Sequence, residues 1–150
     1  MYCPEEIEGV LLTEEKIKAK VSELGELLTR EYAEKNPLFI CVLKGSVVFF
    51  ADLIREIKCP LEISFLRASS YGSGTVSSGN VQFSVGANID MRGRHVVIVE
   101  DIMDTARTLF ALKNELLKRE PESLKIVTLL DKPSRRVVIG LSADYDGFAI

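Results

Sequence analysis

The fold is decided by the stretch Val96-Val97-Ile98-Val99-Glu100-Asp101-Ile102-Met103-Asp104-Thr105-Ala106-Arg107-Thr108-Leu109. Its first four residues are apolar and mostly β-branched, which indicates a buried strand. Three carboxylates, small residues and two hydroxyls follow, and a helical pattern begins directly after them. In open α/β sheets, ligands bind outside the carboxyl ends of the strands. The stretch therefore predicts a ligand site.

The residue types of this turn indicate which ligand it suits. A helix beginning near Thr105 presents unpaired N–H groups and a positive dipole end, so a phosphate fits there, with Thr105 and Thr108 as hydroxyl donors. Glu100 and Asp101 precede this zone and suit sugar hydroxyls or Mg²⁺ held through water. Asp104 lies between the two zones and is placed to take a proton. The alternative is a helix N-terminus with acidic residues for its dipole and a threonine cap.

Strand and helix patterns alternate along the rest of the chain. Helices are predicted over Glu14–Tyr32, Val47–Ile57 and Arg107–Arg119, and strands over Leu38–Leu43, Leu61–Leu66, Val81–Val85, Val96–Val99, Leu124–Leu130 and from Tyr145 to Ile150. This alternation predicts an α/β fold with a doubly wound, mainly parallel sheet flanked by helices. With 150 residues, no linker and no internal repeat, residues 1–150 are expected to form a single domain.

Composition excludes several classes of function. Hydrophobic residues make up 47% and the net charge is −3, so no basic surface for nucleic acid is expected. Apolar runs are too short for a membrane span, and the first residues lack the pattern of a signal peptide. Three cysteines without metal spacing favour a reduced, cytoplasmic setting. His95 is the only histidine, which argues against histidine-based metal sites and Ser-His-Asp catalysis; a solvated position at the start of a strand is expected for it.

Four segments, in order along the chain, resemble those of the hypoxanthine (hypoxanthine-guanine) phosphoribosyltransferases of the type I phosphoribosyltransferase family. They are Val42–Ser46 with Ala51–Ile54 (pyrophosphate turn and following helix), Ser69–Thr75 (mobile active-site loop), Glu100–Thr108 (phosphoribosyl-pyrophosphate, PRPP, motif) and Leu129–Arg136 (purine-side strand end). The likeness runs from Val10 to Ile150 and implies the type I phosphoribosyltransferase fold. For the Lys44-Gly45 turn alone, a glycine-facilitated β–α turn remains the alternative.

The resemblance implies purine salvage. Ribose-5-phosphate would pass from PRPP to hypoxanthine or guanine, giving IMP or GMP and pyrophosphate. Mg²⁺ is the implied cofactor, with Glu100 and Asp101 as the residues that organise it. A cytoplasmic homodimer or homotetramer is the implied assembly, with neither nucleic acid nor membrane as a partner.

The resemblance also implies a role for single residues. Asp104 is the implied catalytic general acid/base, and Lys132 the residue that reads the 6-oxo group of the purine. Ser70 and Tyr71 belong to the implied lid. PRPP and phosphate binding is implied for Lys44, Gly45, Glu100, Asp101, Asp104, Thr105, Ala106, Arg107 and Thr108. A non-proline cis peptide is implied at Leu43-Lys44 or Lys44-Gly45, and Arg136 is a candidate to brace the acidic pair.

Two departures from the family pattern keep alternatives open. Ala106 stands where the family usually has glycine, and alanine suits the position only if φ is not positive. Its methyl group is expected to weaken phosphate binding without abolishing the site. The family sequence also continues beyond residue 150, so the purine side and the C-terminal part of the fold are expected to be incomplete here. A PRPP- or nucleotide-binding module with impaired catalysis is therefore one alternative, and an RNA-binding regulator, disfavoured by the acidic charge, is another.

Overall fold

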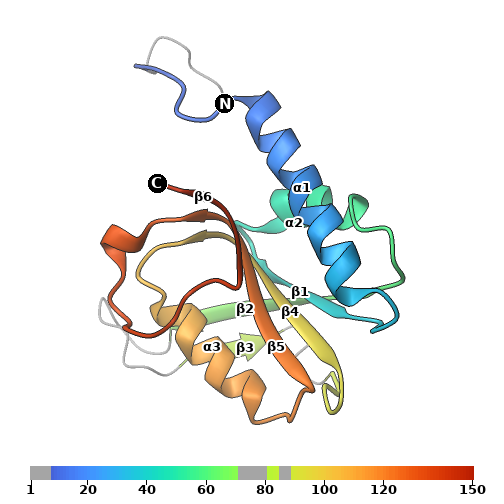
Figure 1. The fold of residues 1–150 in the computed structure, drawn as a ribbon. Helices are drawn as coiled ribbons and strands as arrows, with labels where there is room; N and C mark the ends of the chain where they lie inside the picture. The colour runs from blue at the N-terminus through green and yellow to red at the C-terminus, as the bar shows by residue number, and fades with distance from the viewer. Residues whose placement is uncertain (1–7, 71–80, 85–88) are drawn as a thin grey trace.

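The computed structural model describes residues 8–70, 81–84 and 89–150. These residues form a six-stranded sheet in the order β3-β2-β1-β4-β5-β6, with helices on both faces (Figure 1). The strands are β1 (Leu38–Leu43), β2 (Glu62–Ser70), β3 (Val81–Ser84), β4 (His95–Met103), β5 (Ser123–Asp131) and β6 (Tyr145–Ala149). All neighbours pair parallel except the edge strand β3, which runs antiparallel to β2. The doubly wound, mainly parallel α/β fold is thus confirmed.

Helices cover the sheet from both sides. Helices α1 (Glu14–Tyr32) and α2 (Val47–Arg55) lie on one face and α3 (Arg107–Leu117) on the other (Figure 1). Alternate residues of the central strands therefore enter two cores. Phe39 and Val97 pack under α1 and α2, whereas Ile40 and Ile98 pack under α3. Burial on both faces explains why β1 and the first half of β4 read as continuous apolar runs.

Most element boundaries follow from local hydrogen bonds. Helix α1 has the bounds that the sequence predicted, and its start is fixed by the side chain of Thr13, which accepts a hydrogen bond from the amide of Lys16 at 3.2 Å. Helices α2 and α3 end two residues earlier than predicted, at Arg55 and Leu117. The residues that follow each helix continue as tighter turns with hydrogen bonds to the third residue before them.

Strand β4 is longer than its apolar run. The sequence predicted Val96–Val99, but pairing with β5 continues as far as Met103. Glu100 and Asp101 therefore lie within the strand rather than in the turn after it. This part of β4 stays in the sheet because pairing with β5 satisfies its backbone hydrogen bonds. The polar side chains of Glu100 and Asp101 lie at the edge of the buried region.

The strand order places a topological switch between β1 and β4. The chain leaves β1 through α2 to β2 on one side, whereas β4 lies on the other side of β1 and leads through α3 to β5. Such a reversal opens a crevice at the carboxyl ends of the two central strands, where ligands bind in open α/β sheets. The turns after β1 and β4 both lie at this edge.

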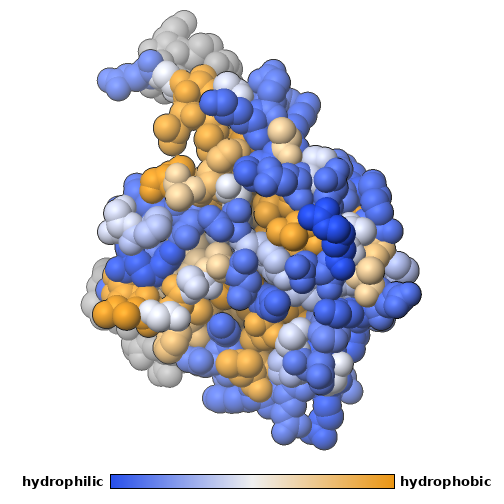
Figure 2. All heavy atoms as spheres, viewed as in Figure 1, coloured by the Kyte–Doolittle hydropathy of each residue, from blue (hydrophilic) through white to orange (hydrophobic). Residues whose placement is uncertain are grey.

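The outer surface is mostly polar. Figure 2 shows hydrophilic residues over much of the visible face, with apolar atoms gathered at the segment before α1, where Val10 and Leu11 are exposed. Within the described part of the chain, no helix is long and apolar enough to cross a membrane. Some large apolar side chains of the helices are also exposed, among them Val48 of α2 and Phe110 of α3.

Gly25 offers a test of the packing between α1 and α2. A Cβ atom at this position would lie 2.4 Å from Cβ and 2.7 Å from the carbonyl oxygen of Glu56. Although alanine is favoured over glycine by about 1 kcal/mol in a free helix, Gly25→Ala should lower the free energy of unfolding by about 1–3 kcal/mol because it overpacks the contact. Urea denaturation measures the change. The control Glu26→Ala, at an exposed position of α1, should stay within about 0.5 kcal/mol. A stabilised Gly25→Ala variant would contradict this packing.

Candidate active site

The turn after β1 lies directly against β4. Lys44 and Gly45 are exposed, and the peptide between Leu43 and Lys44 is cis, as the family resemblance implied. A Cβ atom on Gly45 would lie 3.1 Å from Oδ2 of Asp101. Glycine therefore lets the backbone of this turn approach the acidic pair closely, and the exposed turn is able to meet an anion held above that pair.

Ser46 connects the two turns. Its side chain is fully buried, and its Oγ donates a hydrogen bond of 2.7 Å to Oε1 of Glu100. The amide of Asp101 donates to the same Oγ at 3.2 Å. No individual role for Ser46 was predicted from the sequence. The available signal was its place at the end of a buried strand and the start of a helix, where a small hydroxyl satisfies nearby polar groups.

The acidic pair has no basic partner among the described residues. Burial raises the pKa of Glu100 to about 7, and the neighbouring carboxyl of Asp101 acts in the same direction, while the hydrogen bond from Ser46 opposes it. Among the described residues, no lysine or arginine forms an ion pair with Glu100, Asp101 or Asp104. Two neighbouring carboxylates in this state favour binding of a cation.

Glu100 and Asp101 fit Mg²⁺ better than they fit a metal ion whose ligands all come from the protein. The described residues contain no group of three or more histidine, cysteine, aspartate or glutamate side chains arranged as metal ligands. Mg²⁺ commonly binds through one or two carboxylates and completes its shell with water and substrate phosphates. Glu100 and Asp101 would supply the two carboxylates of such a site.

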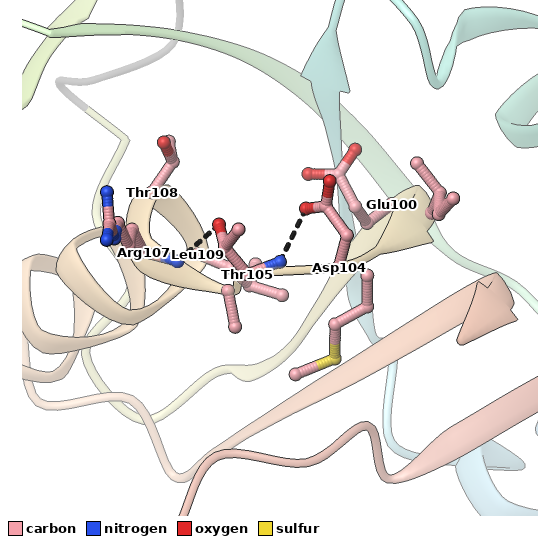
Figure 3. A pocket seen from close by; sticks show the side chains of 9 residues that line it. Glu100, Asp104, Thr105, Arg107, Thr108 and Leu109 are labelled. Atoms are coloured by element: carbon pink, nitrogen blue, oxygen red, sulfur yellow. Dashed lines mark hydrogen bonds between the residues drawn. The ribbon is translucent and has the colours of Figure 1, made fainter. Parts of the chain in front are cut away.

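A small pocket follows at the start of α3. It has a volume of about 80 Å³ and is lined by Glu100, Ile102, Met103, Asp104, Thr105, Ala106, Arg107, Thr108 and Leu109 (Figure 3). Complete small-molecule pockets usually measure about 300–1,000 Å³, so this one suits a single phosphate-sized group. The first amides of α3 have no acceptor within the helix and offer donors to an anion.

Asp104 lies between the acidic pair and this pocket. Its Oδ1 accepts a hydrogen bond of 2.7 Å from the amide of Thr105, and its Oδ2 has no hydrogen-bond partner among the described residues. Figure 3 shows Glu100, Asp104 and Thr108 among the side chains that line the pocket. One oxygen of Asp104 is thus fixed and the other is available for proton transfer.

Ala106 has a left-handed backbone. Its φ is +66° and its ψ is +12°, so the condition under which alanine was expected to suit this position is not met. The residue precedes α3 without a side-chain cap, whereas a threonine cap had been the alternative interpretation of the turn. The residue is 5% exposed and packs in the core under α3, which compensates for part of the backbone cost.

Lys132 lies at the carboxyl end of β5, beside the turn of Asp104. The half-buried Lys132 donates its amide to the carbonyl oxygen of Met103 at 2.9 Å. Arg136 does not brace the acidic pair, contrary to the expectation. It pairs with Asp131 and donates to the carbonyl oxygen of Asp104 instead, because the turn after β5 brings it to the outer side of the β4 turn.

Two further expectations had a mixed outcome. The lid falls mostly outside the described residues: Ser70 ends β2, and its side chain and Tyr71 lie beyond what the structure describes. His95 is half-buried rather than solvated, and its Nδ1 lies 2.7 Å from Oγ of Ser123. It lies at the amino end of β4, whereas the candidate site lies at the carboxyl end, which agrees with a structural role.

Comparison with known proteins agrees with this geometry. Residues 10–145 match the family model described as the phosphoribosyl transferase domain. A hypoxanthine-guanine phosphoribosyltransferase of Lactococcus lactis is 52% identical over 144 residues, which are 96% of this chain and 78% of that protein. The chain belongs to the phosphoribosyltransferase family. A second relative within the family, from Streptococcus thermophilus, carries the same name and is 48% identical over 93% of this chain and 77% of its own length.

Solved structures place the chain in the same branch of the phosphoribosyltransferases. A hypoxanthine phosphoribosyltransferase from Staphylococcus aureus superposes with a TM-score of 0.90 at 42% identity, over 97% of this chain and 79% of that one. A hypoxanthine-guanine phosphoribosyltransferase from Bacillus anthracis gives a TM-score of 0.87 at 44% identity, over 97% of this chain and 85% of its own. The family match over residues 10–145 spans both central turns of the site.

The left-handed Ala106 predicts opposite tolerance for two substitutions. In Ala106→Gly, relief of the left-handed conformation (about 1–2 kcal/mol) is offset by loss of a buried methyl group (about 0.8 kcal/mol) and by a more flexible unfolded chain (about 0.4–1 kcal/mol). The free energy of unfolding should therefore change by less than about 1 kcal/mol. Ala106→Val should lower it by about 2 kcal/mol or more, because a β-branched residue is strained at positive φ and overpacks the core. Equal stability of the valine variant and the parent would show that φ is not positive here.

Proposed function

We propose that this chain is a purine salvage enzyme that transfers ribose-5-phosphate from PRPP to hypoxanthine or guanine, forming IMP or GMP and pyrophosphate. The observation that carries the proposal is the meeting of the Lys44-Gly45 turn and the acidic strand end at the switch point, joined by the hydrogen bond from Ser46 to Glu100. The names of the relatives support the substrate class. Nothing in the described residues favours a module without catalysis.

The phosphoribosyl half of the substrate has a place for each group. Glu100 and Asp101 accept hydrogen bonds from the ribose hydroxyls and hold Mg²⁺, which supplies electrostatic stabilisation of the pyrophosphate when it is bound. Residues 105–108 surround the 5′-phosphate at the start of α3. The turn at Lys44 contributes backbone donors and a positive charge to the pyrophosphate as negative charge develops on it.

The purine half depends on the turns after β4 and β5. Asp104 takes the ring proton of the base through its free oxygen while its other oxygen stays bound to the amide of Thr105. Lys132 donates to the 6-oxo group from the end of the neighbouring strand. Because hypoxanthine and guanine share this group, Lys132 accepts both. The lid of Ser70 and Tyr71 is assigned the exclusion of water, which would otherwise hydrolyse PRPP.

The setting of the enzyme follows from the family resemblance. A cytoplasmic location and a homodimer or homotetramer stay predictions. An acidic net charge of −3 supports neither RNA nor DNA as a partner. Size-exclusion chromatography with light scattering measures the assembly.

The reaction itself is the first test. Purified protein with PRPP, Mg²⁺ and hypoxanthine or guanine should form IMP or GMP, detected by absorbance and by chromatography of the product. Removal of Mg²⁺ with a chelator should abolish the product, and its return should restore it. A folded protein that binds PRPP but forms no nucleotide with either base would refute the enzyme and support the binding module.

Substitutions of the acidic residues should separate proton transfer from binding. Asp104→Asn should lower kcat by about 10²–10⁴-fold, with the Kd for PRPP within about threefold. Glu100→Ala with Asp101→Ala should instead weaken PRPP binding by about 10–100-fold, because charge-assisted hydrogen bonds are lost. Calorimetry and steady-state kinetics measure both. The control Glu122→Gln lies at the opposite end of the sheet and should match the parent, whereas the reverse pattern of effects would show that the roles are exchanged.

Substitution of Lys132 should weaken use of the purine base without changing the binding of PRPP. Lys132→Met removes the donor to the 6-oxo group, so kcat/KM for hypoxanthine and guanine should fall by about 10–100-fold together. The Kd for PRPP should stay within about threefold. The exposed Lys58, on the amino-end side of the sheet, serves as the control in Lys58→Met. A selective loss for one base would contradict recognition of the group that the two bases share.

A further inference from the structure

Three successive carbonyl groups of the turn after β4 are held by one other segment, residues 132–138. Met103 accepts from the amide of Lys132 at 2.9 Å, Asp104 from Nη1 of Arg136 at 2.7 Å, and Thr105 from the amides of Val137 and Val138 at 3.2 and 3.3 Å. The middle contact is made by a side chain and the others by backbone. The contact from Arg136 is therefore the one of these hydrogen bonds that a side-chain substitution removes directly.

Arg136 is itself anchored. Its Nη2 pairs with Oδ1 of Asp131, the last residue of β5, and the two side chains are only 14% and 16% exposed. The planar guanidinium has donors in a fixed fork, so binding Asp131 with one nitrogen sets the direction of the other. The carbonyl of Asp104 is thereby tied to the end of β5 through a charge-assisted contact.

This contact orients the main chain from which the carboxyl group of Asp104 projects. The carbonyl is fixed by Arg136 and Oδ1 is fixed by the amide of Thr105 at 2.7 Å, so Asp104 is held at both its backbone and its side chain. These contacts also direct the carbonyls of residues 103–105 toward residues 132–138, away from the start of α3. Without the contact, the carbonyl of Asp104 loses the charged donor that holds it, and the Asp104–Thr105 peptide is less firmly fixed than in the parent.

We propose that Arg136 is a positioning residue for Asp104: paired with Asp131, it holds the Asp104 carbonyl and so places the free carboxyl oxygen for proton transfer. The inference rests on the proposed reaction and on the role of Asp104 in it. This role of Arg136 differs from that of a stabilising ion pair, because Arg136 affects turnover only by orienting Asp104.

Arg136→Lys is the most informative variant. Lysine keeps the positive charge beside Asp131, so the protein should fold, but it lacks the fork that reaches the Asp104 carbonyl at the same time. We expect kcat to fall by about 10–100-fold, the scale expected for a misplaced catalytic group, while KM for PRPP changes by less than about threefold. The control Arg135→Met removes an exposed arginine of the same turn and should match the parent. Unchanged kcat in Arg136→Lys overturns the inference.

A second background separates positioning from general stability. If Arg136 acts through Asp104, Arg136→Lys should lower kcat by less than about twofold in a protein that already carries Asp104→Asn, because residues that act as a unit are not additive. An equal loss in both backgrounds would show a structural role and overturn the proposal. Melting temperatures of all variants, measured in parallel, establish that each is folded.

Hydrogen exchange tests the contact without any assay of turnover. Arg136→Lys should exchange the amides of residues 103–108 faster than the parent, and Arg135→Met should not. Unchanged exchange in Arg136→Lys overturns the inference even where turnover has fallen. A parent protein without transferase activity would refute the proposed function instead, and faster exchange would then still support the contact between Arg136 and the turn.

Discussion

The parallel pairing of β1 with β4 is the constraint on which the site depends. Leu38 to Cys41 lie opposite Val96 to Val99, in register, and all eight residues are almost completely buried. This register brings the two strands to the same edge, where the buried Ser46 bonds with Glu100. A shift by one residue would exchange the side chains between the two cores and separate the turns. The apolar residues of both strands thus fix the positions of the polar residues that follow them, Ser46 and Glu100.

Burial gives the acidic pair its chemistry. Glu100 continues a buried strand, so its carboxylate is partly removed from water and its pKa rises to about 7. Hydrogen bonds from Ser46 and from the amide of Asp101 to Glu100 offset part of the free-energy cost of burying this carboxyl group. A carboxylate that is held in place but lacks a basic partner is well suited to a cation, since binding the cation replaces the lost hydration. The same packing that stabilises the sheet therefore suits the site to the metal and the polyanionic substrate that are proposed for it.

More details of the sheet than of the candidate site could be predicted from the sequence. Apolar periodicity and the Thr13 cap are local signals, so α1 and β1 were predicted to the residue. The length of β4 was not, because backbone pairing with β5 carries the strand through Glu100 and Asp101, which no local pattern reveals. The partners of Arg136 depend on how the turn after β5 folds back. The positive φ of Ala106 contradicts the preference of its own residue type and follows from the contacts on either side.

Those contacts explain why the left-handed residue is needed. The carbonyls of residues 103–105 are directed to one side, toward residues 132–138, whereas the first residues of α3 line the pocket. The chain must change direction between the two sets, and Ala106 is the residue at which it does so. A right-handed conformation there would continue the earlier direction and take the helix amides out of the pocket. The backbone cost at Ala106 and the contact from Arg136 are thus two parts of one arrangement, in which the acceptors of the turn point away from an anion and its donors point toward it.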